Sequence, residues 1–303
     1  MRFHAQLSVL FALFALFLTG CTQPTTTESS SPTATISTIP TPVAATDPAP
    51  TVTQPSATVT TAPAPTDTIA PTEAPAEPAT AAATASAKTG DMTLGTVTIP
   101  GTDGLALAGT FLAGSGAAPR PTLLLLHMLG ADRSDWQALA TTLNEAGYNT
   151  LALDMRGHGD TGGARDWELA AADHVLVWQY LAERPDVDPT RIGVIGGSIG
   201  ANMTLRLGAA VPQIPTIVLL SPGLNYDGVM TEPEMAGWGD RPVFIVASSE
   251  DSYAADSSTT LASLATHNSS TLHLYDGAGH GTAMLRGAPD LTQRILAWLE
   301  ANL

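Results

Sequence analysis

Cysteine, lysine and aromatic residues are scarce in this 303-residue sequence, which has one cysteine, one lysine (Lys88) and 5% aromatic residues. A single thiol excludes an internal disulfide framework and argues against a cysteine-based metal site. The 12 basic residues are outnumbered by 28 acidic ones, and the net charge of −16 offers no basic surface for nucleic acid. Zinc-site and phosphate-loop motifs are also missing, so we expect no metal, no organic cofactor and no nucleic-acid partner.

The N-terminus lacks an apolar run of the roughly 20 residues that a transmembrane helix requires. Its apolar run, residues 7–18, is about a dozen residues long, follows Arg2 and leads into Leu-Thr-Gly-Cys at 18–21. This ending resembles a bacterial lipobox, in which lipid is attached to the cysteine and the chain is cleaved before it. We therefore predict that residues 1–21 are a lipoprotein signal peptide, and that lipid on Cys21 anchors the protein outside the cytoplasm to a bacterial membrane. A plain secretory signal with an incidental cysteine is the alternative.

Residues 22–90 differ in composition from the rest of the chain. Between residues 22 and 89 lie 12 of the 23 prolines, few charges and no aromatic residue. Such a segment buries too little apolar surface to offset the entropy of ordering it. We predict a disordered linker, rich in Thr, Pro, Ala and Ser, over residues 22–90 and one folded domain over residues 91–303. The sequence gives no indication of the oligomeric state.

Apolar strand-like runs alternate with helix-like segments from residue 121 onward. The short runs are largely apolar throughout, which is typical of strands buried on both faces of a parallel sheet. We expect strands at 121–127, 149–154, 191–198, 215–221, 242–248 and 270–276, after an antiparallel pair at 92–99 and 104–112. We expect helices at 134–147, 166–184, 199–210, 254–266 and 291–303. This order predicts an α/β fold with a mainly parallel central sheet and helices on both faces.

The segment Gly196-Gly197-Ser198-Ile199-Gly200 matches the pattern G-x-S-x-G at a predicted strand-to-helix junction. Such a turn strains the backbone at the serine and crowds the positions two before and two after it, which favours glycine at both. The Ser198 hydroxyl then projects from the turn, and the Ile199 N–H points to where an oxyanion forms. A dinucleotide-binding turn is the alternative, but the glycine spacing does not fit G-x-G-x-x-G.

A serine nucleophile needs a base, and the base needs an acid that orients it. His280 lies in a loop of small residues directly after the last predicted strand, and Asp251 follows the strand at 242–248. Because the carboxyl ends of parallel strands meet at one edge of the sheet, we predict that Ser198, Asp251 and His280 form a catalytic triad. Glu250, adjacent to Asp251, and Asp227, after the preceding strand, are the alternative acids.

The chain also contains "LLLLHMLGADRSDW" at 123–136 and "LDMRGHGDTGG" at 153–163. Together with the motifs around Ser198, Asp251 and His280, these segments make residues 92–303 resemble the α/β-hydrolase superfamily. Within that superfamily the sequence is most similar to the small dienelactone hydrolase-like esterases. The resemblance implies a second oxyanion N–H from Leu129, two residues after His127. Met128 stands where the family usually has glycine, and the Met128 N–H is the alternative donor. The resemblance also implies that His127 and His158 are mostly structural.

The family's lids usually insert after the strand at 215–221, where this chain has only residues 223–240 before the next strand. This length predicts a small, open site without a large cap. Met128, Tyr226, Trp238 and Tyr253 are candidates for lining it, although large apolar residues more often pack the interior.

The predicted function is a serine hydrolase that cleaves small-molecule or polymer-end carboxylic esters through an acyl-enzyme. A peptidase or amidase of the same fold is one alternative. The other is a surface-tethered binding module with an inert triad, since a fold does not by itself establish an activity.

Overall fold

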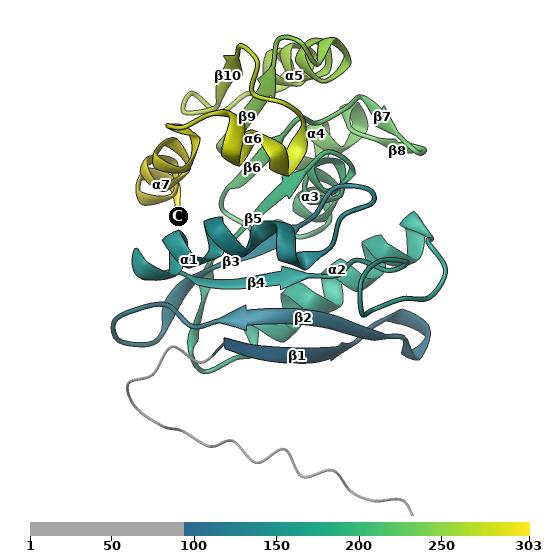
Figure 1. The fold of residues 1–303 in the computed structure, drawn as a ribbon, viewed down its shortest axis with the longest axis vertical. Helices are drawn as coiled ribbons and strands as arrows, with labels where there is room; N and C mark the ends of the chain where they lie inside the picture. Colours follow the sequence, from purple (N-terminus) through teal and green to yellow (C-terminus); the bar gives the residue numbers. More distant parts are fainter. Residues whose placement is uncertain (1–93) are drawn as a thin grey trace, which may run out of the picture. The chain divides into compact units, whose positions relative to one another are not determined.

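A computed structural model of the chain describes residues 94–303 (Figure 1). The predicted signal peptide with Cys21, the predicted linker and residues 91–93 of the predicted domain lie outside these residues. The signal peptide, the linker and the domain boundary therefore stay predictions from the sequence.

An eight-stranded sheet runs through the domain in the order β1-β2-β4-β3-β5-β6-β9-β10 (Figure 1). β2 pairs antiparallel with β1 and β4, and all the other neighbouring strands are parallel. The strands of this sheet are β1 (Leu94–Pro100), β2 (Ala106–Leu112), β3 (Arg120–Leu126), β4 (Asn149–Leu153), β5 (Val187–Gly197), β6 (Ile217–Leu220), β9 (Val243–Ser248) and β10 (Thr271–Tyr275). A small separate hairpin consists of β7 (Asn225–Tyr226) and β8 (Val229–Met230).

Seven α-helices and three short 3₁₀ turns connect the strands described in residues 94–303. The helices are α1 (Gln137–Glu145), α2 (Trp167–Ala182), α3 (Ile199–Ala210), α4 (Glu232–Trp238), α5 (Ser252–Leu264), α6 (Met284–Gly287) and α7 (Leu291–Asn302). The 3₁₀ turns are η1 (Thr102–Gly104), η2 (Arg133–Trp136) and η3 (Gly281–Ala283).

The sheet separates two apolar cores. In β3, Leu123 and Leu125 belong to the core under α1 and α7, whereas Leu124 and Leu126 belong to the core under α2, α3, α4 and α5. Both sets are fully buried, because the alternating side chains of a strand between two helical layers each reach one layer. The uninterrupted leucine run is therefore explained by burial on both faces.

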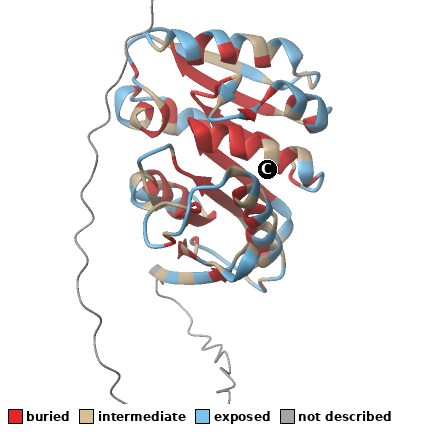
Figure 2. Ribbon diagram, turned by 90° about the vertical axis from the view of Figure 1, so that its right-hand side faces the viewer, coloured by how far each residue is buried: buried red, intermediate tan, exposed pale blue. Residues whose placement is uncertain are grey.

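Helix α3 is buried along almost its whole length, and Figure 2 shows buried residues concentrated in such central elements. Apart from Asn202 and Arg206, the helix has small or apolar residues around its circumference, and from Ile199 to Gly208 only Arg206 is not buried. A helix that is apolar all round belongs in the interior of a layered fold. Its first residue directly follows Ser198, so the predicted nucleophile sits on a buried support.

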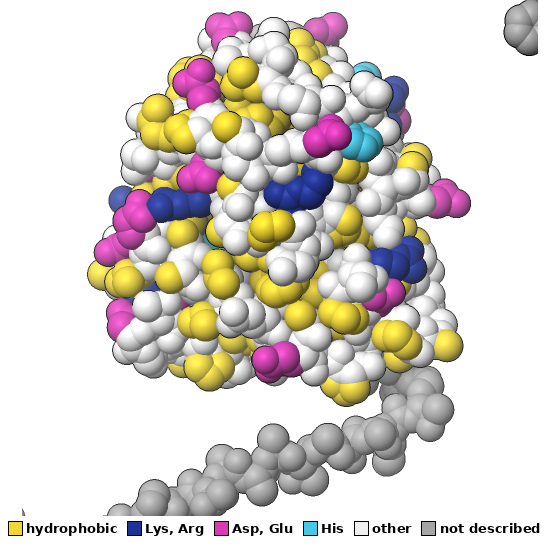
Figure 3. Space-filling view, turned by 180° about the vertical axis from the view of Figure 1, so that it is seen from behind, with side chains coloured by type: hydrophobic (Ala, Val, Ile, Leu, Met, Phe, Trp, Pro, Cys, Tyr) yellow, Lys and Arg dark blue, Asp and Glu magenta, His cyan; other side chains and the backbone are white. Residues whose placement is uncertain are grey.

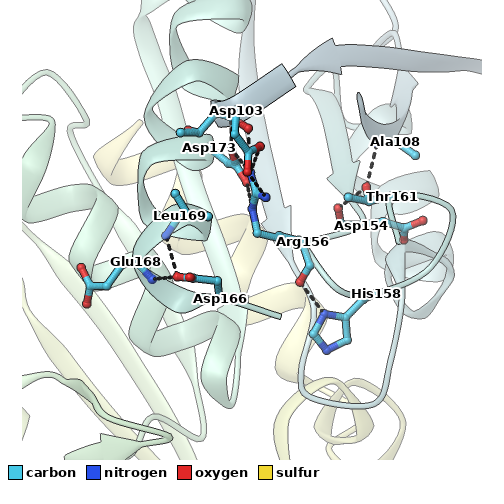
Figure 4. A network of polar contacts seen from close by, with 11 residues as sticks. Asp103, Ala108, Asp154, Arg156, His158, Thr161, Asp166, Glu168, Leu169 and Asp173 are labelled. Carbon is cyan, nitrogen blue, oxygen red and sulfur yellow. Dashed lines mark hydrogen bonds and ion pairs between the residues drawn. The ribbon is translucent and has the colours of Figure 1, made fainter. Parts of the chain in front are cut away.

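A buried arginine fixes the segment that follows β4 (Figure 4). Arg156 donates to both carboxylate oxygens of Asp173 in α2, at 2.8 and 3.1 Å, and to those of Asp103 in η1, at 3.0 and 3.1 Å. In the same segment, Thr161 donates to the carbonyl that follows β4 at 2.7 Å and accepts from the Ala108 N–H of β2 at 2.8 Å. These contacts hold the loop at the carboxyl end of β4 against β2 and α2.

The predicted fold class is confirmed, and each expected strand and helix is present; α3 has the predicted bounds, and the other elements differ at one or both ends. β5 begins at Val187 rather than at 191, because Val187 pairs with Arg120 across an irregularity in the register. The hairpin β7–β8 and helix α4, which were not predicted, occupy the 223–240 segment, and no large cap domain is present among residues 94–303.

The surface of the described domain carries charge of both signs. On the face shown in Figure 3, basic and acidic side chains are scattered among apolar and neutral ones. None of the helices between residues 94 and 303 combines the length and the apolar character that a membrane span needs.

Candidate active site

Ser198 lies at the tip of a sharp turn between β5 and α3. Its backbone is in the left-handed region, with φ of 53° and ψ of −123°, and the residue is 7% exposed. A Cβ at Gly196 would lie 2.1 Å from the Gly200 carbonyl oxygen, and one at Gly200 would lie 2.2 Å from the Leu126 carbonyl oxygen. These distances are too short for any side chain, so the turn requires both glycines of the G-x-S-x-G pattern.

The structure brings Ser198, His280 and Asp251 together from three loops at the carboxyl edge of the sheet. The Ser198 Oγ and the His280 Nε2 are 2.7 Å apart, and the His280 Nδ1 forms a close hydrogen bond with the Asp251 Oδ2. The hydrogen bond to the carboxylate places a proton on Nδ1, so Nε2 is free to accept the serine proton. This is the geometry of a nucleophile, a base and an orienting acid.

The two alternative acids occupy other positions. Glu250 accepts from the Ser248 hydroxyl at 2.8 Å and from the Gly277 N–H, which lowers the pKa of its carboxyl. Asp227 lies in the turn between β7 and β8 with φ of 49°. Neither carboxylate bonds the His280 ring, so only Asp251 has the contact that the acid of a triad needs.

The loop that carries His280 is held by hydrogen bonds from small polar residues that the sequence analysis did not single out. The Ser221 Oγ accepts from the Gly281 N–H at 3.0 Å, and the Ser248 Oγ accepts from the Ala278 N–H at 3.0 Å. The Thr282 hydroxyl donates to the Asp135 carboxylate at 2.7 Å. These bonds connect the loop to the ends of β6 and β9 and to η2, and they fix the backbone on both sides of His280. No local sequence signal marks the partners, because they lie far apart in the chain.

The two predicted oxyanion donors are Ile199, directly after the serine, and Leu129, in the loop that follows β3. Ile199 is the first residue of α3, so its N–H has no carbonyl one turn earlier in the helix to bond. Leu129 is 44% exposed and sits in the turn that the Ala131 N–H closes onto the Met128 carbonyl at 3.2 Å. The positive end of the α3 dipole adds a favourable field for negative charge at the serine. The assignment of Leu129 or Met128 as the second donor stays a prediction.

His127 supports the backbone of this second loop. Its Nε2 accepts from the Met155 N–H at 3.0 Å, so the proton is on Nδ1, which donates to the Met128 carbonyl at 2.8 Å. Burial lowers the pKa of His127 and favours this neutral form. His158 packs edge-on against the ring, with centroids 4.9 Å apart. Both histidines thus contact backbone and each other in the positions that the sequence indicated as structural.

Met128 and Tyr226, two of the predicted substrate-lining residues, lie close to the triad. A Cβ at Gly281 would lie 3.0 Å from the Met128 Sδ and 3.6 Å from the Ser198 Cβ, so both residues border the same glycine. The Tyr226 ring is edge-on to His280 at 6.2 Å, and its hydroxyl lies 3.5 Å from the Ser221 carbonyl. Burial and then the charge of Asp251 raise the pKa of Tyr226, which keeps its hydroxyl protonated.

Tyr253 has a more peripheral place than Tyr226. It is 46% exposed, and its hydroxyl bonds both the N–H and the carbonyl of Asn225, at 2.9 and 3.0 Å. Its ring packs edge-on against Tyr226, with centroids 5.6 Å apart. Tyr253 therefore holds the β7–β8 hairpin and with it the position of Tyr226.

The prediction that Trp238 lines the site is wrong. Trp238 is 1% exposed and belongs to the core between α4 and α3. A Cβ at Gly208 of α3 would lie 2.7 Å from the indole, so the ring fills the space that this glycine leaves. Its Nε1 donates to the Arg241 carbonyl at 2.7 Å, and the Arg241 guanidinium stacks on the ring at 3.7 Å from its centroid. Packing of a large aromatic side chain outweighs its possible use in the site.

No group of three or more histidine, cysteine or acidic side chains among residues 94–303 is arranged to hold a metal ion. The polar groups around Ser198 bond one another or backbone atoms. Ser198 supplies a hydroxyl nucleophile and His280 a proton acceptor.

Sequence relatives match parts of the chain. A family model described as serine aminopeptidase, S33, matches residues 117–241. Esterase FrsA from Yersinia pestis (strain Pestoides F) is 32% identical over 154 residues, which cover 47% of this chain and 36% of that protein. An uncharacterized protein from Mycobacterium tuberculosis is 34% identical over 121 residues, which cover 40% of this chain and 42% of that protein. The chain thus spans less than half the length of each of these relatives.

Solved structures match the whole described domain. A dienelactone hydrolase from Anabaena variabilis has a TM-score of 0.58 at 18% identity, with 70% of this chain and 99% of that chain covered. The Pyrococcus furiosus esterase Pf2001 has a TM-score of 0.59 at 20% identity, with 70% of this chain and 93% of that chain covered. At these identities the likeness concerns the fold. Together with the strand order and the turn at Ser198, it shows that the described domain has the α/β-hydrolase fold.

Proposed function

We propose that the domain is a serine hydrolase that cleaves carboxylic esters through an acyl-enzyme. The observation that carries this proposal is the hydrogen-bonded series from Ser198 Oγ to His280 Nε2, at 2.7 Å, and from His280 Nδ1 to Asp251. The left-handed backbone at Ser198 adds to it, because strain of this kind is retained where the surrounding structure requires it.

In the proposed reaction, the Ser198 Oγ attacks the ester carbonyl carbon while its proton passes to the His280 Nε2. The N–H groups of Ile199 and Leu129 stabilise the oxyanion. When the bond to the alcohol oxygen breaks, His280 gives its proton to that oxygen and the alcohol leaves. Water then loses a proton to His280 and attacks the acyl carbon, and the returning proton restores Ser198 as the acid is released. Asp251 keeps the imidazole oriented throughout and stabilises its charged form.

The proposed substrates are small or polymer-end esters. The segment between β6 and β9 forms only a hairpin and a two-turn helix, so bulky groups on either side of the ester meet no cap. Met128 and Tyr226 supply one apolar and one hydroxyl-bearing wall next to the serine. The protonated Tyr226 hydroxyl is suited to donate to the ester or to the departing alcohol.

Labelling with a fluorophosphonate probe tests the proposal. Wild-type protein is expected to take up one probe, and mass spectrometry is expected to locate it on Ser198. There are two controls. Ser198→Ala removes the nucleophile, and heat denaturation of the wild type removes the assembled site. Hydrolysis of p-nitrophenyl acetate, butyrate and octanoate then ranks the chain lengths. A folded wild-type protein that neither labels nor hydrolyses these esters contradicts the proposal and favours an inert binding module.

Amide hydrolysis is the second candidate, and the family model described as serine aminopeptidase supports it. An aminopeptidase must pair the substrate's ammonium group with a carboxylate. Two carboxylates are candidates for this pairing. Asp135 accepts from the Thr282 hydroxyl next to the His280 loop, and Asp227 lies in the turn of the β7–β8 hairpin. Amino-acid p-nitroanilides and acyl p-nitroanilides, assayed beside the esters, distinguish the candidates. Faster turnover of a free-amine anilide than of any ester favours the aminopeptidase.

The predicted anchor is a separate proposal about the N-terminal residues. We propose that Cys21 carries lipid and anchors the domain outside the cytoplasm to a bacterial membrane. Mass spectrometry of the N-terminal peptide from membrane-extracted protein is expected to find diacylglycerol on Cys21. Cys21→Ala is expected to remain unlipidated, and an unmodified Cys21 in the mature wild-type protein contradicts the proposal.

A further inference from the structure

The β7–β8 hairpin beside the candidate active site is held in place by the rest of the domain. Each of its strands has two residues, and Tyr226 pairs with Val229 across it. A hairpin of this length buries too little apolar surface to be stable alone. The Tyr226 ring lies edge-on to His280, so the contacts that fix the hairpin also fix this ring beside the proposed base.

The side chain of Asn202 bonds the hairpin segment at two points. Asn202 belongs to α3, four residues after Ser198, and is fully buried. Its Oδ1 accepts from the Gly223 N–H at 3.0 Å, and its Nδ2 donates to the Val229 carbonyl at 2.9 Å. Gly223 precedes the hairpin, and Val229 is the cross-strand partner of Tyr226. One amide group therefore holds the chain on both sides of the tyrosine.

The backbone of Gly223 is the surface against which the Tyr226 ring packs. A Cβ at Gly223 would lie 2.7 Å from two carbon atoms of the ring, so the ring occupies the space of a side chain. The Gly223 carbonyl accepts from the buried Thr231 hydroxyl at 2.8 Å. Because Asn202 bonds the N–H of Gly223 and Thr231 bonds its carbonyl, the backbone under the ring is fixed.

The same asparagine is bonded to the turn that carries the predicted nucleophile. The Asn202 N–H donates to the Ser198 carbonyl at 3.2 Å, one helical turn earlier. The Tyr226 hydroxyl lies near the Ser198 side chain. Asn202 thus connects the backbone of the serine to the segment that places the tyrosine.

The two bonds to the hairpin segment explain why an amide is present inside α3. A buried amide is unfavourable unless its groups are hydrogen-bonded, and both groups of Asn202 are. An apolar side chain at this position would leave the buried Gly223 N–H without this acceptor. The asparagine is therefore suited to its position by the segment that it holds.

We propose that Asn202 is a positioning residue, which holds the β7–β8 hairpin so that the Tyr226 hydroxyl donates a hydrogen bond to the ester in the transition state. The proposal rests on the proposed esterase function. The hairpin is then a fixed wall of the site, and its hydroxyl is in place before the substrate binds. Asn202 itself does not touch the substrate and acts through Tyr226.

A double-mutant cycle in p-nitrophenyl ester hydrolysis by the full chain tests the proposal. Asn202→Ala and Tyr226→Phe are each expected to lower kcat/KM about 3- to 10-fold, the effect of one hydrogen bond. Because the asparagine acts through the tyrosine, Asn202→Ala is expected to change kcat/KM less than about 2-fold in the Tyr226→Phe background. Effects that multiply in the double variant overturn the proposal, as does an unchanged kcat/KM in Asn202→Ala.

Asn149→Ala is the matched control. Asn149 is also fully buried, its Oδ1 accepts from the Gly114 N–H at 2.9 Å, and its Nδ2 donates to the Asp186 carbonyl at 2.9 Å. It begins β4, at the edge of the sheet opposite the triad. Both variants are expected to lose stability in urea unfolding, but Asn149→Ala is expected to keep the wild-type kcat/KM. A fall in kcat/KM of similar size in both variants overturns the proposal.

Hydrogen exchange followed by mass spectrometry supplies a measurement that needs no activity. The peptide over residues 223–231 is expected to exchange faster in Asn202→Ala than in wild type, and equal rates overturn the proposal. Faster exchange together with a wild type that hydrolyses no ester would refute the esterase function, while the hold of Asn202 on the hairpin stands.

Thr231→Val replaces Asn202→Ala in the cycle should that variant not fold. It keeps the volume of the side chain and removes only the hydroxyl that bonds the Gly223 carbonyl. It is expected to lower kcat/KM in wild type and to change it less than about 2-fold in the Tyr226→Phe background. Effects of Thr231→Val and Tyr226→Phe that multiply overturn the proposal in that case.

Discussion

The hydroxyl of Ser221 is expected to position His280, the proposed catalytic base, without touching the substrate. Ser221 directly follows β6, is fully buried, and accepts the Gly281 N–H at 3.0 Å, one residue after His280. Ser221→Ala removes the acceptor and leaves that N–H buried without a partner. Alanine and serine both carry a Cβ, so the left-handed backbone at this position, with φ of 52°, is disfavoured in both and the change isolates the hydroxyl.

The size of the effect follows from this contact. A buried N–H left without an acceptor lowers the free energy of unfolding by about 1–3 kcal/mol. The larger consequence concerns geometry, because Ser221 is one of few contacts that hold the loop next to His280. A shift of the imidazole by about 1 Å lowers kcat roughly 100-fold, so we expect a loss of about 10- to 100-fold in kcat with little change in KM.

The assay pairs Ser221→Ala with Thr216→Val at the other end of the same strand. Thr216 is also fully buried, and its hydroxyl accepts from the Trp298 Nε1 at 2.9 Å. Urea unfolding is expected to show a loss of stability in both variants, whereas p-nitrophenyl ester kinetics are expected to show a fall in kcat only in Ser221→Ala. Equal kcat values in the two variants would refute the reasoning, because the Ser221 contact would then be structural only.

Four further predictions rest on other contacts. Gly200→Ala places a Cβ 2.2 Å from a backbone carbonyl oxygen of β3. We expect this variant to lower the free energy of unfolding by about 1–3 kcal/mol or more and to abolish fluorophosphonate labelling. Gly95→Ala is the control, because the space around Gly95 is open, and it is expected to change neither property. Burial lowers the pKa of His174 to about 4, so the unfolded chain binds more protons between pH 6.5 and 4 and stability is lost as pH falls through that window. Urea unfolding at pH 4.5 and 7 is expected to show about 2.5 kcal/mol more acid destabilisation in wild type than in His174→Phe, and equal losses contradict it. Arg156→Met leaves the Asp173 carboxylate, which is 1% exposed, without its cation. We expect this variant to lower the free energy of unfolding by about 3–5 kcal/mol. A loss under about 1 kcal/mol in urea unfolding would contradict a stabilising role of the buried ion pair. Tyr226→Phe removes the hydroxyl near Ser198. We expect it to lower kcat/KM for esters about 3- to 10-fold without a change in the urea midpoint. An unchanged kcat/KM would exclude a role for the hydroxyl in the reaction.

The sequence predicted the parts of this protein that local constraints determine. The apolar runs of β3, β6 and β9 indicate strands because each is buried on both faces. Gly196 and Gly200 point to the turn at Ser198 because no larger residue fits at either position. The mainly parallel direction of the strands and the edge at which the loops meet then follow from the alternation of strands and helices.

Contacts between distant segments were outside the reach of the same reasoning. Sequence position left Asp251, Glu250 and Asp227 open as the acid, and only the fold shows which carboxylate contacts His280. Trp238 was misplaced because its partner, the space left by Gly208, lies in another helix.

Ser221 and Thr150 illustrate the limit most clearly, because each is a small polar residue at the edge of an apolar run and neither belongs to a motif. What distinguishes them is a partner in one case and the lack of one in the other: Ser221 bonds a backbone N–H 60 residues away, and the Thr150 hydroxyl bonds nothing in the described domain. Burial gives both facts their weight, since an exposed hydroxyl would exchange its partner for water at little cost in free energy. A buried hydroxyl that bonds a distant backbone N–H, as Ser221 does, therefore affects the site in a way that no local sequence pattern predicts.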